Sequence, residues 1–382
     1  MRSAGYQDDS PRCWCCNNNR PFYSILIVIT SIVLLSMLAS LSYGGYYIYT
    51  RRDAWIAADE QSQNSFTDDG VVTMSEIDST YSEDTPVPDG PNDVQPPFAT
   101  QSDEPERTRT KWPDISNEEI KAISSQLWAI DRQNQIPQNL YQINPQGKVN
   151  ISERVDHAPL PLFSRMNADL STWSMTFTRF IALLNNYNPQ VKVSEEITEG
   201  EKQETESFLD ALLQTRVMQA LYQFLVEKRI LTSDRQDFRN KLKDLWFDPY
   251  SRSTRYNATD SSGFEHVFVG ETRGKVTGFH NWIQYYLQEK EGNANYYGHH
   301  YYAPDQPWMI NIQFTWLNKF KKETSFFLGT NPEFDFAIYT LCIMTRTNKG
   351  CQLNINGLNP TILSYDINHT QGLQVGTSFP AI

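Results

Sequence analysis

The sequence predicts an α+β fold, with a helical N-terminal lobe and a C-terminal lobe rich in antiparallel sheet. Apolar residues recur at helical spacing between about residues 111 and 250. From about residue 251 onward, short β-branched and aromatic runs bounded by glycine are interspersed with two helical stretches. An uncharged apolar stretch and an acidic stretch come before both lobes, so we also expect a single transmembrane helix and a disordered linker.

The first 106 residues divide into three segments. Residues 1–21 are short and polar, as expected for a cytoplasmic tail. Residues 22–49 contain no charged side chain and exceed the apolar core of about 7–15 residues that is usual in a cleaved signal peptide, so a transmembrane signal anchor is favoured. Residues 50–106 form an acidic linker, with 14 acidic and no basic side chains from residue 53 onward, which cannot bury enough apolar surface to become ordered.

The charge of the chain is concentrated in this linker. The formal net charge is -12, which argues against a protein that binds nucleic acid over its whole surface. Residues 107–382, however, carry 28 basic and 29 acidic side chains and are nearly neutral. RNA binding by this part would therefore depend on a local basic patch.

Orientation in the membrane follows from weaker signals, because arginines flank the apolar segment on both sides. Three Asn-x-Ser/Thr triplets favour a lumenal or extracellular C-terminal part, in a single-pass type II protein of the secretory pathway or cell surface. They begin at Asn150, Asn257 and Asn368. In such a compartment Cys342 and Cys351 could form a disulfide worth about 2–3 kcal/mol, and two buried thiols are the alternative.

Four helices are expected in the N-terminal lobe, and none of them carries an evident catalytic motif. Residues 114–119 offer a helix start, and the first helix is marked by Ile120, Ile123, Leu127 and Ile130. The others are expected over residues 168–188, 203–229 and 234–246. The long helix over 203–229 has an apolar stripe consisting of Phe208, Leu212, Val217, Leu221 and Leu225.

Two histidines stand out at the start of the C-terminal lobe. Residues 264–269 alternate around His266 and predict a strand, followed by a turn at Gly274-Lys275 and a returning strand over 276–279. An antiparallel return would bring His280 toward His266. Two imidazoles at one cleft suit general acid–base chemistry near neutral pH, although hydrogen-bonded structural histidines are the alternative.

The remaining elements of this lobe are two helices and a β-rich end. Residues 281–291 are expected to be helical. Asn331-Pro332-Glu333 supplies an N-cap, a proline at the first helical position and an acid in the first turn, before a buried helix over 334–344. Several short strands with glycine turns are expected over 351–382.

Five stretches in this part of the chain resemble the EndoU family of uridylate-specific endoribonucleases. In order they are GFEHVFVGE, KVTGFHNWIQYY, QFTWLNKFK, LGTNPEFDFAIYTLC and GTSFP. The resemblance runs from about Trp112 to the C-terminus, within a domain expected over 107–382. It implies an enzyme that cleaves single-stranded, U-containing RNA by attack of the 2′-hydroxyl on the adjacent phosphorus, as a lyase-type reaction that leaves 2′,3′-cyclic phosphate ends.

The resemblance also implies the roles of individual residues. His266 matches the family's general acid and His280 its general base. Lys321 matches the lysine that offsets phosphate charge, although Lys319 and Lys322 lie close to it.

The uracil-reading residues and the metal are likewise implied by the family. Thr377 and Phe379 match the T-x-Y-P motif that recognises uracil in the family, with Phe379 in place of the family's tyrosine. Glu265 and Glu271 are expected either to orient a histidine or to contact the Mn²⁺ on which many members depend. The sequence shows no metal-binding motif of its own, and the adjacent His299 and His300 are expected at the surface.

We therefore expect a membrane-anchored, monomeric endoribonuclease. The alternative is a catalytically weak RNA-binding or cell-surface interaction module on the same fold. Retention of both histidines and the lysine favours the enzyme. A serine hydrolase is disfavoured because the sequence contains no G-x-S-x-G motif.

Overall fold

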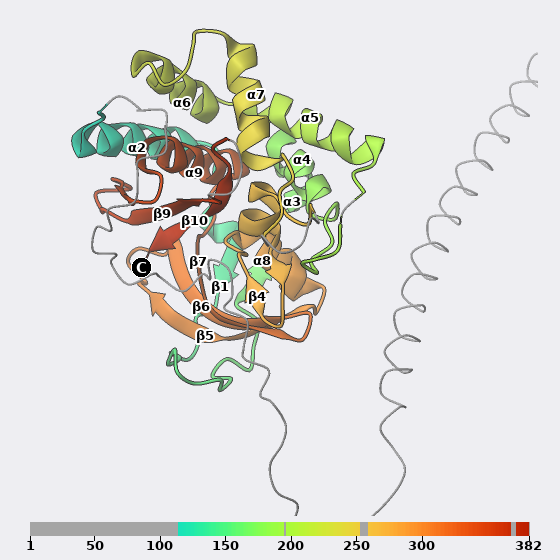
Figure 1. Ribbon diagram of the computed structural model, residues 1–382. Helices are drawn as coiled ribbons and strands as arrows, with labels where there is room; N and C mark the ends of the chain where they lie inside the picture. The colour runs from blue at the N-terminus through green and yellow to red at the C-terminus, as the bar shows by residue number, and fades with distance from the viewer. Residues whose placement is uncertain (1–113, 195, 253–258, 368–371, 382) are drawn as a thin grey trace, which may run out of the picture. The chain divides into compact units, whose positions relative to one another are not determined.

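The computed structural model describes residues 114–194, 196–252, 259–367 and 372–381 (Figure 1). The predicted membrane segment over 22–49, the linker over 50–106, and the acceptors Asn257 and Asn368 lie outside these residues. Within the described ranges, no helix is both long and apolar enough to cross a bilayer. The elements form the mixed α+β fold that the sequence predicts.

The N-terminal half contains six helices among the described residues, with a short 3-10 turn and a two-stranded sheet. The helices are α2 (Asn117–Asp131), α3 (Leu170–Trp173), α4 (Met175–Leu183), α5 (Glu199–Gln214), α6 (Arg216–Glu227) and α7 (Arg235–Trp246). The turn is η1 (Gln138–Leu140), and β1 (Tyr141–Ile143) pairs with β2 (Phe163–Met166). The predicted start of α2 is confirmed: Ser116 is its N-cap and forms a capping box with Glu119.

Two helices predicted as continuous are each broken by a hydroxyl residue. Residues 168–188 form α3 and α4, and residues 203–229 lie in α5 and α6. Ser174 and Thr215 adopt extended backbone angles and cap the helices that follow them, through bonds to the backbone N–H groups of Phe177 and Met218. The predictions failed because the apolar stripe continues across each break, and periodicity alone does not detect a capping residue.

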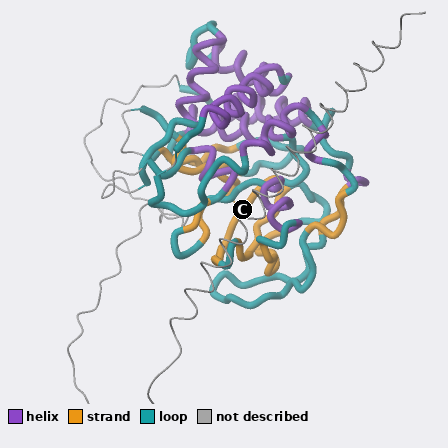
Figure 2. The backbone as a smooth tube through the Cα atoms, turned by 90° about the vertical axis from the view of Figure 1, so that its right-hand side faces the viewer, coloured by secondary structure: helices purple, strands orange, loops and turns teal. Residues whose placement is uncertain are grey.

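Among the described residues, the C-terminal half contains the larger sheets and two α-helices. Strands β5 (Ala294–Tyr302), β6 (Met309–Trp316) and β7 (Lys319–Phe327) form an antiparallel sheet in that order, and α8 (Trp282–Lys290) packs beside β5. Strands β8 (Gly350–Gln352), β9 (Thr361–Asp366) and β10 (Val375–Ala381) form a second antiparallel sheet in the order β10-β9-β8. The longer helices gather at one end of this unit and β5–β7 at the other (Figures 1 and 2).

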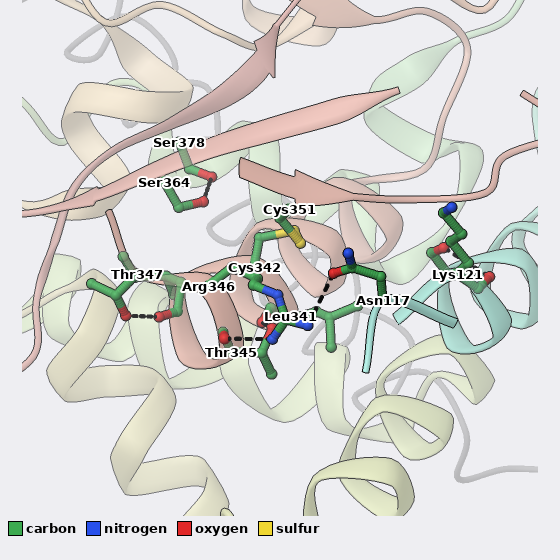
Figure 3. The surroundings of a disulfide bond; sticks show 12 residues. Asn117, Lys121, Leu341, Cys342, Thr345, Arg346, Thr347, Cys351, Ser364 and Ser378 are labelled. Carbon is green, nitrogen blue, oxygen red and sulfur yellow. Dashed lines mark hydrogen bonds between the residues drawn. A yellow bond between two sulfur atoms is a disulfide. The ribbon is translucent and has the colours of Figure 1, made fainter. Parts of the chain in front are cut away.

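Helix α9 (Pro332–Arg346) is the centre of the described unit. It contacts α2, α4 and α6 as well as all three strands of the β8–β10 sheet. Every residue from Pro332 to Met344 is buried, as expected for a helix covered on all sides. A disulfide joins Cys342 on α9 to Cys351 on β8, so the helix is covalently attached to the sheet (Figure 3).

Candidate active site

His266 lies in a π-helix and not in the strand that the alternating pattern predicted. The π-helix η2 spans Glu265–Val269, and Gly270 donates its N–H to the carbonyl of Glu265 at 2.8 Å. The strand prediction was wrong for a physical reason. Phe264 and Phe268 are four residues apart and their tilted rings pack with centroids 5.2 Å apart, and every residue from 263 to 271 is buried. Alternation is informative only where one face is exposed, so this run gave a false strand signal.

The second histidine is attached to this π-helix through the backbone. The carbonyls of His266 and Val267 accept hydrogen bonds from the N–H groups of Phe279 and His280, at 2.9 and 2.6 Å. A π-helix bonds residues five apart, which shifts the local hydrogen-bond ladder and leaves carbonyls for other donors. The chain returns to this point through a short hairpin, β3 (Glu271–Thr272) paired with β4 (Val276–Thr277). The predicted turn at Gly274-Lys275 is confirmed, but the returning strand ends at Thr277 and its partner is β3, not the run around His266.

Gly278 makes this backbone contact sterically possible. Its φ is +62°, and a Cβ at this position would lie 1.8 Å from the carbonyl oxygen of His266. Only glycine allows both the left-handed backbone and the close approach. The two histidines are therefore brought together by the backbone of η2 and of the segment 278–280.

A buried carboxylate orients the His266 ring. Glu271 accepts from Nδ1 of His266 at 2.6 Å, from the Ser261 hydroxyl, and from Nε of Arg252 at 3.0 Å. Burial alone would raise the pKa of Glu271, but the charges of Arg252 and His266 and the hydrogen bonds outweigh it and lower the pKa to about 2. The carboxylate is thus ionised at neutral pH, and its bond to Nδ1 turns Nε2 of His266 away from it.

Arg252 is a residue that the sequence analysis missed. Its guanidinium also donates to the carbonyl of Gly376 at 2.7 Å and to the Tyr250 hydroxyl at 3.0 Å. It therefore connects the carboxylate behind His266 to β10, the strand that carries Thr377. Arg252 lies outside every stretch that resembles the family, and no local pattern marks it.

His280 is held by neutral groups. Its Nδ1 lies 3.0 Å from Thr324 Oγ1 and 3.2 Å from the carbonyl oxygen of Ser325, both on β7. The Phe379 ring stacks on the imidazole, with centroids 4.8 Å apart and planes 18° apart. The two histidines thus differ in environment, since one contacts a carboxylate and the other contacts uncharged acceptors and an aromatic ring.

Lys321 lies on the same strand as the residues that hold His280. It is 2% exposed, whereas Lys319 and Lys322 are exposed, so burial distinguishes it among the three lysines of this strand. Lys321 pairs with Phe314 of β6, a core residue that packs on Phe279, the neighbour of His280.

Thr377 and Phe379 are half-buried on β10, which packs beside η2 and β7. The hydroxyl oxygen of Thr377 is buried and has no hydrogen-bond partner among the described residues. A buried hydroxyl without a partner is costly, so this oxygen is suited to bind a polar ligand atom.

The donors available for Mn²⁺ do not fit a metal site. Glu271 already binds Arg252, Ser261 and His266, and Glu265 is fully buried in η2. No group of three His, Cys, Asp or Glu side chains suited to a metal occurs in the part of the chain that the structure describes. His299 is half-buried, with its Nδ1 2.9 Å from the carbonyl of Pro145, and His300 is half-buried with its Nε2 3.0 Å from the carbonyl of Lys322.

Known proteins are similar to the part of the chain that contains these site residues. A family model described as Endoribonuclease XendoU matches residues 119–380. A Mus musculus protein named "Uridylate-specific endoribonuclease" is 40% identical over 257 residues, which are 66% of this chain and 61% of that protein. A Danio rerio protein named "Uridylate-specific endoribonuclease B" is 38% identical over 273 residues, which are 69% of this chain and 95% of that protein.

A solved structure also matches, described as "The structure of XendoU: a splicing independent snoRNA processing endoribonuclease". It has a TM-score of 0.60 and 34% identity, and the match covers 70% of this chain and 98% of that one. The chain spans about 61% of the length of its Mus musculus relative. His266, His280, Lys321 and Thr377 all lie inside the matched range.

Proposed function

Because the chain belongs to the XendoU endoribonuclease family, we propose that it is an endoribonuclease that cleaves single-stranded RNA at uridines and leaves 2′,3′-cyclic phosphate ends. The proposal is supported by the names of the relatives and by the chemistry of the site. Its reaction needs one group to accept a proton, one to donate a proton, and one cation for the phosphate.

The difference between the two histidines is the observation that carries this proposal. His266 donates from Nδ1 to the Glu271 carboxylate at 2.6 Å, which holds the ring with Nε2 directed away from Glu271, so it suits the general acid that donates from Nε2. His280 has its Nδ1 beside the Thr324 hydroxyl oxygen and the Ser325 carbonyl oxygen, which favour a proton on Nδ1 and a lone pair on Nε2, so it suits the general base.

The proposed reaction conserves protons and charge. Nε2 of His280 accepts the proton of the 2′-hydroxyl as O2′ attacks phosphorus. The bond from phosphorus to the 5′-oxygen breaks, and Nε2 of His266 donates its proton to that leaving oxygen. Lys321 offsets the negative charge that grows on the non-bridging phosphate oxygens. No step is assigned to Mn²⁺.

Recognition of uridine is assigned to β10. The Thr377 hydroxyl would bind the uracil edge, because its oxygen is buried without a hydrogen-bond partner among the described residues. Phe379 has no hydroxyl, so it offers only a ring face, and a stacked base is worth about 1–3 kcal/mol. We expect cleavage mainly at U.

The test is cleavage of an oligonucleotide containing all four bases by the full chain, with Mn²⁺ or with EDTA. The wild type should produce cyclic phosphate ends at U. His266→Ala and His280→Ala should each lose about 10²–10⁴-fold in rate, the usual contribution of one proton transfer. His157→Ala is the control, since that histidine is exposed on a loop. RNA binding without cleavage by the wild type would instead identify a binding module.

We also propose that the chain is a type II membrane protein with this domain in the lumen or outside the cell. Asn150 is exposed and its side chain accepts from the Ser152 N–H at 3.1 Å, which leaves the acceptor triplet at the surface. Endoglycosidase should increase gel mobility, and Asn150→Gln should reduce that change. Unchanged mobility of the wild type in a mammalian cell would contradict this topology.

A further inference from the structure

We propose that Thr324 is a positioning residue that sets the tautomer of His280, with the proton on Nδ1 and the lone pair on Nε2. This inference rests on the proposed function, because it explains how His280 is prepared to accept a proton. It adds a residue that neither the family resemblance nor the motifs of the sequence indicate.

The argument begins with the single proton of the Thr324 hydroxyl. Thr324 is 2% exposed, and its Oγ1 lies 2.8 Å from the carbonyl oxygen of Phe279 and 3.0 Å from Nδ1 of His280. A carbonyl oxygen can only accept, so the bond to Phe279 uses the hydroxyl proton. Toward His280, the same oxygen must then act as an acceptor.

A second acceptor makes the same demand on the ring. The carbonyl oxygen of Ser325 lies 3.2 Å from Nδ1 of His280. If Nδ1 carried the lone pair, it would face this carbonyl oxygen with no proton between them, at a buried site where such repulsion is poorly screened. With a proton on Nδ1, both oxygens of β7 are satisfied. In a neutral imidazole the other nitrogen, Nε2, then accepts.

The arrangement also connects the tautomer to the backbone that brings the histidines together. The carbonyl that receives the Thr324 proton belongs to Phe279, whose N–H binds the carbonyl of His266 at 2.9 Å. Phe279 has a left-handed backbone, with φ of +69°. Thr324 therefore contacts both the strained residue that precedes His280 and the His280 ring.

The experiment compares three variants of the full chain. Thr324→Val keeps the shape of the side chain and removes the hydroxyl, whereas Thr324→Ser keeps the hydroxyl. Thr340→Val is the matched control, because Thr340 is also fully buried and its hydroxyl accepts from Trp246 Nε1 at 2.9 Å, on α9. We expect Thr324→Val to lower kcat by about 10- to 100-fold, the range for losing an outer partner of a working histidine, with KM little changed. Thr324→Ser and Thr340→Val should stay close to wild type in kcat.

A direct measurement of the tautomer tests the inference without depending on catalysis. Long-range ¹H–¹⁵N spectra of protein labelled with ¹⁵N-histidine distinguish the two neutral tautomers, and His280→Asn identifies the relevant signal. The wild type should show a proton on Nδ1 of His280, and Thr324→Val should show a mixture. A wild-type proton on Nε2, or an unchanged kcat in folded Thr324→Val, would overturn the inference. If no protein cleaves RNA, the proposed function fails, and the spectra still decide the tautomer.

Discussion

Individual residues in this site are defined by the charge that each one faces. Glu271 is fully buried and tolerates burial because Arg252 and His266 contact it from different segments of the chain. His280 instead contacts the Thr324 hydroxyl, the Ser325 carbonyl and the Phe379 ring, which are all uncharged. The two imidazoles, His266 and His280, thus acquire different chemistry from their neighbours.

Loss of Arg252 is predicted to cost far more stability than loss of an exposed arginine. Arg252→Met leaves a buried carboxylate without its cation, which typically costs about 3–5 kcal/mol. The double variant Arg252→Met with Glu271→Gln should recover part of that loss, because neither charge remains. Urea unfolding of the single and double variants measures both effects.

Arg239→Met is the control for this cycle. Arg239 binds Glu206 and Asp210, whose side chains are 36% and 59% exposed, so the pair is solvated and worth about 1 kcal/mol or less. Equal destabilisation by Arg252→Met and Arg239→Met would show that the Glu271 charge is not dependent on Arg252.

At the level of elements, the site depends on one irregular helix and one tight turn. The π-helix η2 supplies two carbonyls to the segment 278–280, and β7 supplies Lys321, Thr324 and Ser325. Strand β10 lies beside both and supplies Thr377 and Phe379. Three segments, η2, β7 and β10, therefore meet at His280.

Gly278→Ala is predicted to abolish activity, because its Cβ would lie 1.8 Å from the His266 carbonyl and would separate the two histidine segments. Gly274→Ala is a matched control. Gly274 also has a left-handed backbone, with φ of +70°, but no atom lies within 4 Å of a Cβ there. It should lose only the backbone penalty of about 1–2 kcal/mol and remain active. Equal activity in the two variants would contradict the role of the close contact. Rates of RNA cleavage and thermal melts distinguish these outcomes.

At the scale of the whole molecule, a buried acidic cluster joins the helical lobe to the start of α8. Asp335 on α9 accepts from Thr330 Oγ1 at 2.7 Å and from Asn281 Nδ2 at 3.2 Å, and Asn281 caps α8 directly after His280. Asp131 on α2 and Glu333 on α9 are the nearby carboxyl groups. Burial raises the pKa of Asp335 to about 7.

From this cluster we predict that the free energy of unfolding falls as pH rises from about 4 to 7. The pKa of Asp335 is about 7 in the folded chain and has its usual value of 3.8 in the unfolded chain, so the folded state binds more protons between these two values. Burial raises the pKa of Asp131 and of Glu333 in the same direction. The lowered pKa of Glu271 acts in the opposite sense, but only below about pH 4.5.

Urea unfolding across this pH range tests the prediction, with Asp335→Asn as the comparison. The wild type should lose more stability between about pH 4 and 7 than the variant, because the variant has no proton to release at this position. Parallel curves for the two proteins would mean that Asp335 does not titrate in this window.

Much of the architecture could be predicted from local patterns. The starts of α2 and α7, the buried character of α9, the β3–β4 turn and the β-rich end all follow from spacing, capping residues and glycines close together in the chain. The same reasoning joined α3 to α4 and α5 to α6, because a capping hydroxyl within an apolar stripe has no periodic signature. It also assigned a strand to η2, because a fully buried run has no polar face.

The sequence by itself determined the fold class and the family, because these depend on composition and on short sequence motifs. The same motifs identified His266, His280 and Lys321 as the residues to examine. Only the tertiary structure decided how they work together. The π-helix, the Arg252 contact to Glu271, the hydroxyl of Thr324 at His280 and the burial that separates Lys321 from its neighbours depend on groups up to 124 residues apart, as from Arg252 to Gly376. Such contacts form only when the chain has packed, since desolvation and hydrogen-bond geometry belong to the folded state and leave no pattern along the sequence.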